Sequence, residues 1–276
     1  MKALKNFTEK NKKIQKLRKI LKSYKSVLVA FSGGSDSSFL LKAAIDFLGA
    51  DKVLAVTVKS EFIPEKKILE AKSIAETIGA RWITIDIPVL YESNLIKNPA
   101  NRCYICKKTI LKSLKKIAKK EGLNQVIEGA ITEDREGYRP GVKAVRELKV
   151  KSPLIEAGFS KEEIRKFSRK LSLPTWDKPS FTCLATRFPY GTRLTKKNLE
   201  KVAAAEDFLA NKTFKQFRVR YHGNIARIEV PEKDFDKLLS QRKNIIAEFK
   251  KIGFDYITLD IEGYRSGSMD IGIENG

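Results

Sequence analysis

The sequence predicts an α/β protein in which helices cover both faces of a mostly parallel sheet, followed by a smaller α+β domain. Three observations lead to this prediction. Short apolar runs of strand length alternate with amphipathic segments over residues 26–128, and a turn rich in Gly and Ser follows the first run. Beyond residue 195 the order becomes helix, two strands, helix and strand. We therefore expect two domains, 1–195 and 196–276.

The elements of the first domain follow one another in a regular order. Apolar residues at three- and four-residue spacing predict a helix that ends near residue 25. The expected strands are 26–31, 52–58, 82–87 and 125–128, and the expected helices that follow the first three are 39–48, 68–78 and 107–120. Gly49, Gly79 and Gly122 come just after these helices, where glycine is preferred. A parallel sheet of this kind binds ligands at the carboxyl ends of its strands.

The remaining elements are separated by a loop-rich stretch. Residues 130–195 contain many Gly and Pro residues and are expected to be mostly loops, with one helix. Ser160 and Glu163 form the pattern of a capping box, in which each side chain bonds the other residue's backbone at a helix start. In the second domain we expect helices at 198–209 and 232–252 and strands at 217–221, 226–230 and 256–261.

The chain is strongly basic, with a formal net charge of +22 over 276 residues. Three explanations remain open: lysine-rich helix faces in contact with water, a surface that binds nucleic acid, and a field that attracts small phosphorylated substrates. Lysines at the polar positions of the 107–120 helix favour the first. No apolar run approaches the roughly 20 residues that span a bilayer. Because the amino terminus also lacks the apolar stretch of a signal peptide, we expect a soluble, cytoplasmic protein with no membrane partner.

Residues 32–37 form a turn rich in Gly and Ser between a predicted strand and a predicted helix. Glycines allow the backbone to approach a phosphate closely, and the helix that follows offers unpaired N–H groups at its positive end. No lysine follows the glycines, so the loop is not of the Gly-x-x-x-x-Gly-Lys type. An ordinary turn with Asp36 near a helix start is the alternative. The order of strand, loop and helix favours phosphate binding.

The Ser-Gly-Gly-x-Asp-Ser pattern of this loop resembles the pyrophosphate loop of the N-type ATP pyrophosphatases, which cleave ATP between the α and β phosphates. The resemblance implies that Asp36 helps to hold Mg²⁺, a cation that prefers oxygen ligands. It also implies that Thr57 and Ser60 lie beside the adenosine and that Gly129 borders the same pocket. The ATP-binding residues expected in this way are Ser32, Gly33, Gly34, Ser35, Asp36, Ser37, Thr57, Ser60 and Gly129.

The chain has three cysteines, Cys103, Cys106 and Cys183, an odd and sparse set that does not predict a disulfide framework. A Cys-x-x-Cys at a helix start favours thiolate, because the helix dipole and neighbouring cations stabilise negative charge. Four kinds of site remain open: buried structural thiols, a redox dithiol with a bystander, a Cys₃His zinc site with His222, and a persulfide or sacrificial cysteine. We favour a fifth, a [4Fe–4S] cluster with three thiolate ligands, because the missing ligand would leave one iron free to bind sulfur from outside.

Several further motifs are more distinctive than the loop. They are 137–141 (GYRPG), 152–158 (SPLIEAG), 173–179 (LPTWDKP), 183–185 (CLA), 187–191 (RFPYG) and 259–269 (LDIEGYRSGSM). On these segments the chain resembles the LarE family, ATP-dependent sulfur transferases that help to make the nickel-pincer nucleotide cofactor of lactate racemase. Together with the loop at 32–37, the resemblance covers nearly the whole chain.

This resemblance implies an enzyme that adenylates the carboxylates of pyridinium-3,5-biscarboxylic acid mononucleotide and replaces AMP with sulfur. In some members the cysteine that Cys183 matches gives up its own sulfur. Cys103 and Cys106 are additional here, as in cluster-bearing members, where the open iron would carry sulfide. The expected cofactors are therefore ATP, Mg²⁺ and a [4Fe–4S] cluster bound by all three cysteines, and the expected partners are the nucleotide substrate, sulfide and further copies of the chain in a homo-oligomer.

Basic side chains near the phosphates would stabilise charge in the transition state. The candidates in the matched motifs are Arg102, Lys107, Arg139, Lys178 and Arg187. In the second domain the alternation over 217–222 places Arg218, Arg220 and His222 on one strand face. That face is either exposed to solvent, in contact with a phosphate, or part of a subunit interface.

Three other functions remain open. A tRNA thiolase would also combine a pyrophosphate loop with a three-cysteine cluster, and the positive net charge agrees with it. An ammonia-using amide ligase would carry zinc or bare thiols at the cysteines. A non-enzymatic RNA-binding module would not convert ATP to AMP.

Overall fold

A computed structural model describes residues 4–7, 11–135, 140–179 and 181–270. The chain forms two compact units, one made of residues 1–88 with 101–181 and the other of residues 89–100 with 182–276. The units therefore divide near residue 181 rather than near 195, and residues 89–100 join the second unit. The two domains expected from the sequence stay a prediction, because a compact unit is not evidence of independent folding. None of the helices in the described ranges combines the length and apolar character needed to cross a membrane.

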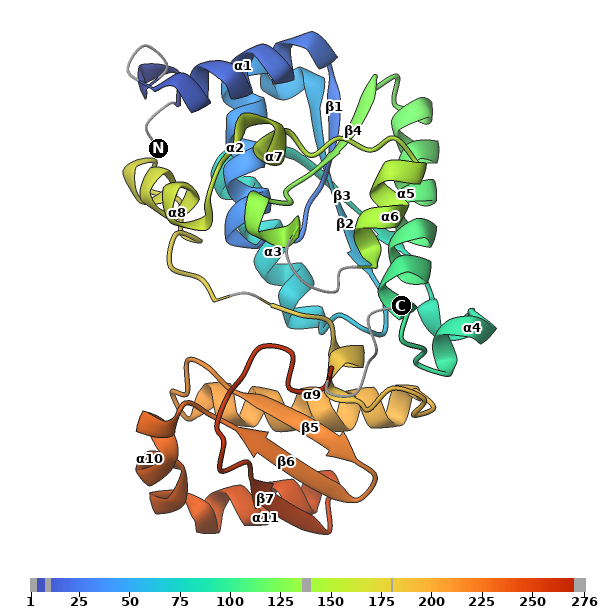
Figure 1. Cartoon of the computed structure of the whole chain (residues 1–276), viewed down its shortest axis with the longest axis vertical. Helices are drawn as coiled ribbons and strands as arrows, with labels where there is room; N and C mark the ends of the chain where they lie inside the picture. Colours follow the sequence, from blue (N-terminus) through green and yellow to red (C-terminus); the bar gives the residue numbers. More distant parts are fainter. Residues whose placement is uncertain (1–3, 8–10, 136–139, 180, 271–276) are drawn as a thin grey trace. The chain divides into compact units, whose positions relative to one another are not determined.

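The first unit is built on a four-stranded sheet with the order β3-β2-β1-β4 (Figure 1). The strands are β1 (Val27–Ala30), β2 (Val53–Lys59), β3 (Arg81–Asp86) and β4 (Gln125–Glu128). Every neighbouring pair is parallel, and Val27 is in register with both Val53 and Gln125. The prediction of a parallel sheet is confirmed. The carboxyl ends of β1 and β4 lie side by side, and the loop after β1 starts there.

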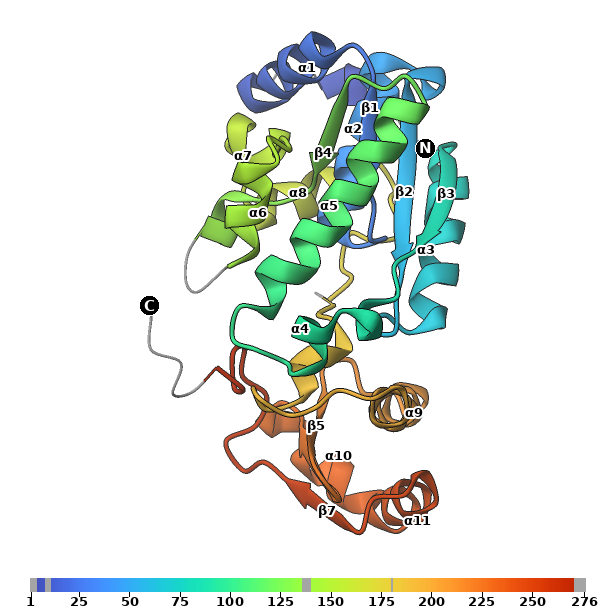
Figure 2. The same ribbon diagram turned by 90° about the vertical axis from the view of Figure 1, so that its right-hand side faces the viewer.

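Alternate side chains of the strands enter two separate hydrophobic cores. On one face Val27 and Val29 pack with α1 (Lys12–Tyr24), α2 (Ser35–Leu48), α3 (Glu65–Ile78), α7 (Pro153–Ala157) and α8 (Lys161–Lys170). On the other face Leu28 packs with α5 (Arg102–Lys120) and α6 (Gly141–Glu147). Figure 2 views the molecule from the α5 side and shows that helix crossing the sheet. Both faces of the sheet are covered, as predicted.

Several helices begin at a different residue from the one expected. Residues 4–25 hold a short 3₁₀ helix, Leu4–Phe7, and then α1, whose start is fixed by the Asn11 side chain accepting from the Ile14 N–H at 3.0 Å. Helix α5 begins at Arg102 rather than Lys107, so the two cysteines of its Cys-x-x-Cys lie in its first two turns. Helix α2 begins at Ser35, inside the Gly-Ser turn. The phosphate-binding candidates are therefore part of a helix start.

The second unit contains a three-stranded sheet with the order β5-β6-β7. Strands β5 (Arg218–His222) and β6 (Ile225–Glu229) are antiparallel, and β7 (Tyr256–Leu259) is parallel to β6. The helices are α4 (Ser93–Ile96), α9 (Lys196–Asn211), α10 (Phe235–Ser240) and α11 (Arg242–Ile252). The prediction of a single helix over 232–252 is wrong. Gln241 breaks it with a non-helical ψ of 7°, and the Ser240 hydroxyl donates to the Lys237 carbonyl at 2.9 Å there.

Candidate functional site

The loop between β1 and α2 packs closely against α3 because Gly33 has no side chain. Gly33 has a φ of 68°, and a Cβ on it would lie 2.9 Å from the Cα of Ala71 on α3. Gly34 precedes α2 and gives it no side-chain cap. The first N–H groups of α2 thus face the loop without a capping side chain, as expected at an anion-binding helix start. The Ser37 hydroxyl donates to the Gly34 carbonyl at 3.2 Å and lies 3.1 Å from the Ser32 hydroxyl.

A cavity of about 750 Å³ opens beside this loop, within the first unit. Its wall brings together residues that are far apart in the sequence: Ser32, Gly34, Asp36, Ser37, Cys103, Lys107, Glu128, Gly129, Arg146, Lys151 and Phe181 are among them. A Cβ on Gly129 would lie 3.0 Å from the Ser37 nitrogen, so the end of β4 packs directly on the loop. The cavity lies at the carboxyl ends of the strands, where parallel sheets bind ligands.

Asp36 has a partner that the sequence does not reveal. The Lys161 ammonium lies 2.7 and 2.6 Å from the two Asp36 carboxylate oxygens and donates to the Ser35 hydroxyl at 2.7 Å. Lys161 is the first residue of α8, and its backbone N–H donates to the Glu133 carboxylate at 2.9 Å. The capping box at Ser160 is confirmed and predicts where α8 starts, but it gives no signal for what the adjacent lysine contacts. A Mg²⁺ ion on Asp36 would have to replace this ammonium or share the carboxylate with it.

Lys178 also contacts the loop. Its ammonium donates to the Gly33 carbonyl at 3.2 Å and lies 2.7 Å from Glu70 on α3. Burial alone would raise the pKa of Glu70, but hydrogen bonds from Lys178 and Lys67 outweigh it and hold that pKa below its ordinary 4.5. Lys178 therefore links the segment before Cys183 to the loop.

Cys103 and Cys106 lie one helical turn apart near the start of α5. Cys103 is exposed and lines the cavity, while Cys106 is half-buried. Lys107, one turn after Cys103, forms an ion pair with the Glu128 carboxylate at 2.6 Å, and the Ser152 hydroxyl donates to the same carboxylate at 2.7 Å. A thiol, an ammonium and a carboxylate thus line the same cavity as the loop. Arg102 precedes them and is buried, with 4% of its surface exposed.

Cys183 belongs to the second unit and is half-buried at the start of a 3₁₀ helix, Leu184–Arg187. Arg187, 1% exposed, holds this turn. Its guanidinium binds both Glu206 oxygens, at 2.7 and 3.0 Å, and donates to the Thr182 hydroxyl at 2.6 Å and to the Cys183 carbonyl at 3.4 Å. Over the described residues no three Cys, His, Asp or Glu side chains form a metal-binding group. The shared cluster stays a prediction.

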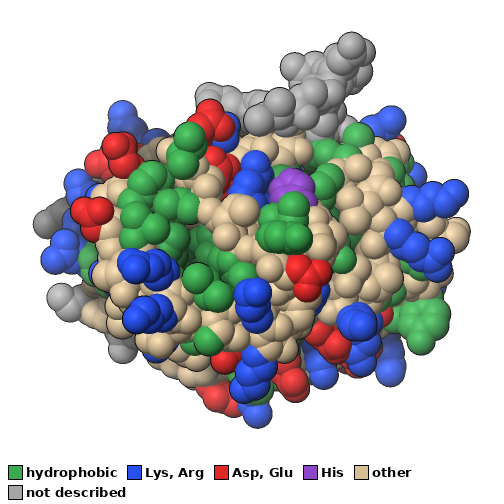
Figure 3. Space-filling view, turned by 90° about the horizontal axis from the view of Figure 1, so that it is seen from below, with side chains coloured by type: hydrophobic (Ala, Val, Ile, Leu, Met, Phe, Trp, Pro, Cys, Tyr) green, Lys and Arg blue, Asp and Glu red, His purple; other side chains and the backbone are tan. Residues whose placement is uncertain are grey.

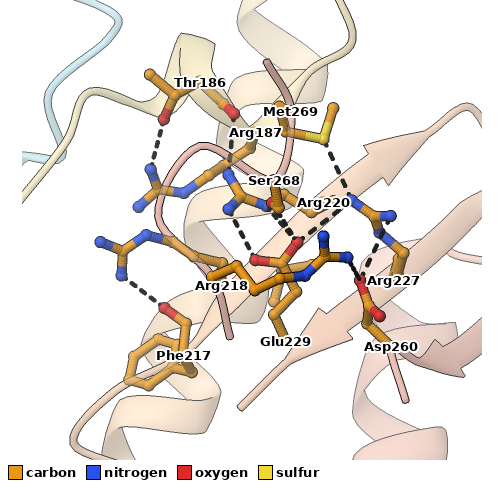
Figure 4. Close-up of polar contacts among 12 residues, drawn as sticks. Thr186, Arg187, Phe217, Arg218, Arg220, Arg227, Glu229, Asp260, Ser268 and Met269 are labelled. Carbon is orange, nitrogen blue, oxygen red and sulfur yellow. Dashed lines mark hydrogen bonds and ion pairs between the residues drawn. The ribbon is translucent and has the colours of Figure 1, made fainter. Parts of the chain in front are cut away.

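Arg218 and Arg220 lie in the second unit, in a network of charged side chains (Figure 4). Arg220 is 5% exposed and binds both Glu229 oxygens, at 2.9 and 2.7 Å, and the Thr186 carbonyl at 3.0 Å. Arg218 donates to the Phe217 carbonyl at 2.6 Å, and burial together with the charge of Arg187 lowers the pKa of Arg218. The solvent-exposed alternative is therefore wrong for Arg220. Binding of phosphate by Arg187 or Arg220 would require these ion pairs to rearrange.

Thr57 and Ser60, which were expected beside the adenosine, are not among the described residues that line the 750 Å³ cavity. Thr57 is 3% exposed, and its hydroxyl donates to the Phe31 carbonyl and accepts from the Trp82 indole, each at 2.9 Å. That hydroxyl already has hydrogen-bond partners within the sheet. Ser60 lines a separate cavity of about 340 Å³ with Ile63, Ile68, Ile87 and Pro88. Arg139 falls outside the described residues.

Comparisons with known proteins agree with this arrangement. Residues 9–117, which contain the loop and both cysteines of α5, match the NAD synthase family. The chain is 39% identical to the pyridinium-3,5-bisthiocarboxylic acid mononucleotide synthase of Lactiplantibacillus plantarum, over 91% of each chain. It is 37% identical to an uncharacterized protein of Synechocystis sp., over 94% of this chain and 97% of the relative. An uncharacterized protein of Methanocaldococcus jannaschii is 31% identical, over 92% of this chain and 98% of the relative.

Proposed function

The chain belongs to the LarE family of ATP-dependent sulfur transferases, and we propose that it converts the carboxylates of pyridinium-3,5-biscarboxylic acid mononucleotide to thiocarboxylates. The observation that carries this proposal is the single cavity that joins the phosphate-binding loop to Cys103 and Lys107. ATP activation and sulfur delivery need to occur side by side, and this cavity holds groups suited to both.

The reaction has two steps. In the first, a substrate carboxylate oxygen attacks the α-phosphorus of ATP and pyrophosphate leaves, so that an acyl-adenylate forms. In the second, a sulfur nucleophile attacks the acyl carbon, and AMP leaves with the electron pair of the carbon–oxygen bond. We propose that the loop N–H groups stabilise the phosphate charge that develops in the first step, and that Lys161 and Lys178 contribute once phosphate competes with their partners Asp36 and Glu70. Holding the reactants together in one cavity lowers the activation free energy, by about 7–11 kcal/mol where the reacting atoms are well oriented.

The first unit supplies two ligands that suit an iron–sulfur cluster. Cys103 and Cys106 are separated by one helical turn, at the positive end of α5, where thiolates are stabilised. Thiolates are the ligands that such clusters prefer. We propose that Cys183 is the third. When bound, the cluster would supply sulfide from outside the protein, so that no cysteine would lose its sulfur. Asp36 offers the oxygen ligands that Mg²⁺ prefers.

The experiment uses full-length protein purified without oxygen. ATP, sulfide and the biscarboxylate nucleotide are supplied, and AMP, thiocarboxylate, iron and the mass of the intact chain are measured. We expect one AMP for each thiocarboxylate, an unchanged chain mass after many turnovers, and loss of bound iron in Cys103→Ser, Cys106→Ser and Cys183→Ser. If the mass of the chain instead falls by the mass of H₂S in a single turnover, Cys183 gives up its own sulfur and the cluster is not the sulfur carrier. Formation of AMP together with an amide from ammonia would refute sulfur transfer.

A further inference from the structure

One large aromatic side chain on the cavity wall is not explained by the packing of the fold. Phe181 remains 41% exposed, yet it lines the same cavity as the phosphate-binding loop and Cys103. Binding cavities typically combine aromatic walls with a few polar groups that fix the orientation of the ligand. Phe181 is the ring that this cavity offers among the lining residues that the structure describes.

A chain of charged contacts connects the Phe181 ring to the loop. The Lys67 ammonium lies 5.7 Å from the ring centroid, and Glu70 binds that ammonium at 2.9 Å. Glu70 also pairs with Lys178, which donates to the Gly33 carbonyl. The ring therefore already has a cation over one face, and a carboxylate balances that charge. The same contacts connect the ring to the loop where ATP is expected.

We infer that the other face of Phe181 is a platform on which the pyridinium ring of the substrate stacks. This inference rests on the proposed function and adds a specificity-determining residue to it. The face of an aromatic ring carries negative potential, so it attracts a positively charged ring more strongly than a neutral one. A pyridinium ring is planar and cationic, and it therefore gains both stacking and charge attraction. A neutral ring of the same shape gains only the stacking.

The position of Phe181 in the chain supports this role. Cys183 is two residues further on, and consecutive Cα atoms are about 3.8 Å apart, so the Cα atoms of these two residues lie within about 7.6 Å of each other. That limit holds for any arrangement of the two units. A ring stacked on Phe181 would keep its carboxylates in the cavity that Cys103 lines and close to the chain segment that carries Cys183.

The test measures binding to the full-length chain by equilibrium dialysis. The probes are nicotinate mononucleotide, which has a pyridinium ring, its dihydropyridine form, in which the ring carries no charge, and a non-hydrolysable ATP analogue. We expect Phe181→Leu to weaken pyridinium binding by about 2- to 30-fold, the range of cation–π attraction, and Phe181→Tyr to preserve it. Trp176→Leu is the matched control. Trp176 is 37% exposed and packs against Arg169 at 5.0 Å, but it is not among the residues that line the cavity.

A thermal unfolding midpoint close to that of the wild type shows that each variant is folded. Equal affinity of the wild type and Phe181→Leu for the pyridinium probe would overturn the inference, and so would an equal loss for the dihydropyridine probe. Loss of ATP-analogue binding in Phe181→Leu, with Trp176→Leu unaffected, would mean that the Phe181 ring contacts adenine. That result would also overturn the inference. These outcomes leave the proposed function intact. A wild-type chain that binds the ATP analogue but neither nicotinate mononucleotide nor the biscarboxylate nucleotide would refute both.

Discussion

Gly129 shows how one residue without a side chain lets the end of β4 pack against the phosphate-binding loop. A Cβ at this position would lie 3.0 Å from the Ser37 nitrogen and 3.1 Å from its Cα, and these are backbone atoms at the start of α2. Gly129→Ala must therefore displace the phosphate-binding loop. We expect ATP-dependent AMP formation to fall by about 10- to 100-fold, because displacements near 1 Å have effects of this size on positioned reactants. Steady-state assays of AMP release would measure the change.

Gly141→Ala provides the control for that substitution. A Cβ on Gly141 would meet the Cδ of Lys107 at 3.1 Å, the outer part of a flexible side chain that can move aside. We expect only a small loss of activity in this variant. Equal losses in the two variants would show that crowding of the cavity in general, and not displacement of the loop, controls the reaction.

At the scale of single residues, the sequence predicts local features better than it predicts which distant side chains contact each other. The phosphate-binding loop could be predicted because strand, glycines and helix start are consecutive. The Lys161–Asp36 pair joins residues 125 positions apart, and no local pattern indicates it. Arg220 was predicted by its charge, but its burial against Glu229 depends on how β5 and β6 pair, which the alternation of residues does not specify.

At the scale of elements, the capping box of α8 links helix stability to the site. The Ser160 hydroxyl accepts from the Glu163 N–H at 3.2 Å, and the Glu163 carboxylate accepts from the Ser160 N–H at 2.9 Å. Ser160→Ala removes one of these bonds, and we expect a loss of about 0.5–2 kcal/mol in the free energy of unfolding. Urea denaturation would measure it. Because Lys161 is the next residue, we also expect weaker binding of an ATP analogue.

Ser160→Thr is the matched control, because threonine also caps a helix through its hydroxyl. It should retain both stability and nucleotide binding. If Ser160→Ala lost stability but bound the ATP analogue as well as the wild type did, the position of Lys161 would not depend on the helix start.

The elements also show where patterns of sequence stop being informative. Strands β1, β2 and β4 were predicted closely, because their apolar runs are buried in the cores on the two faces of the sheet, and the edge strand β3 was found from its alternating pattern although its side chains are only partly buried. The start of α5 was placed five residues late, since Cys103 and Cys106 read equally well as loop or helix. The break at Gln241 was missed because apolar spacing continues across it into α11.

At the scale of the whole molecule, the basic side chains lie in two kinds of place. Lys161 and Lys178 contact the loop or its aspartate. Other lysines cover solvent-facing helix surfaces, and on α5 the exposed ones are Lys112, Lys115, Lys116, Lys119 and Lys120. On the face shown in Figure 3, basic side chains alternate with acidic and apolar ones and form no continuous stripe. This distribution agrees with water-exposed lysine helices as the main source of the charge.

A molecule with a net charge of +22 should be destabilised by repulsion among its own charges. Raising the NaCl concentration from about 10 to about 100 mM shortens the screening length from about 30 to about 10 Å. We therefore expect the calorimetric unfolding midpoint to rise, by roughly 2–4 °C for each kcal/mol of repulsion that is screened. Attractive pairs at the surface, such as Lys13–Glu163, weaken under the same conditions, but each contributes no more than about 1 kcal/mol.

The double variant Lys116→Glu, Lys119→Glu separates charge repulsion from other effects of salt. Both side chains are exposed on α5, and the two reversals lower the formal net charge from +22 to +18 without touching the cavity. If repulsion is the cause, this variant should have a higher midpoint than the wild type at low salt and a smaller rise on adding NaCl. A midpoint that falls with salt in both proteins would mean that attractive ion pairs outweigh the repulsion, so the lysines would have to be arranged for pairing and not only for exposure to water.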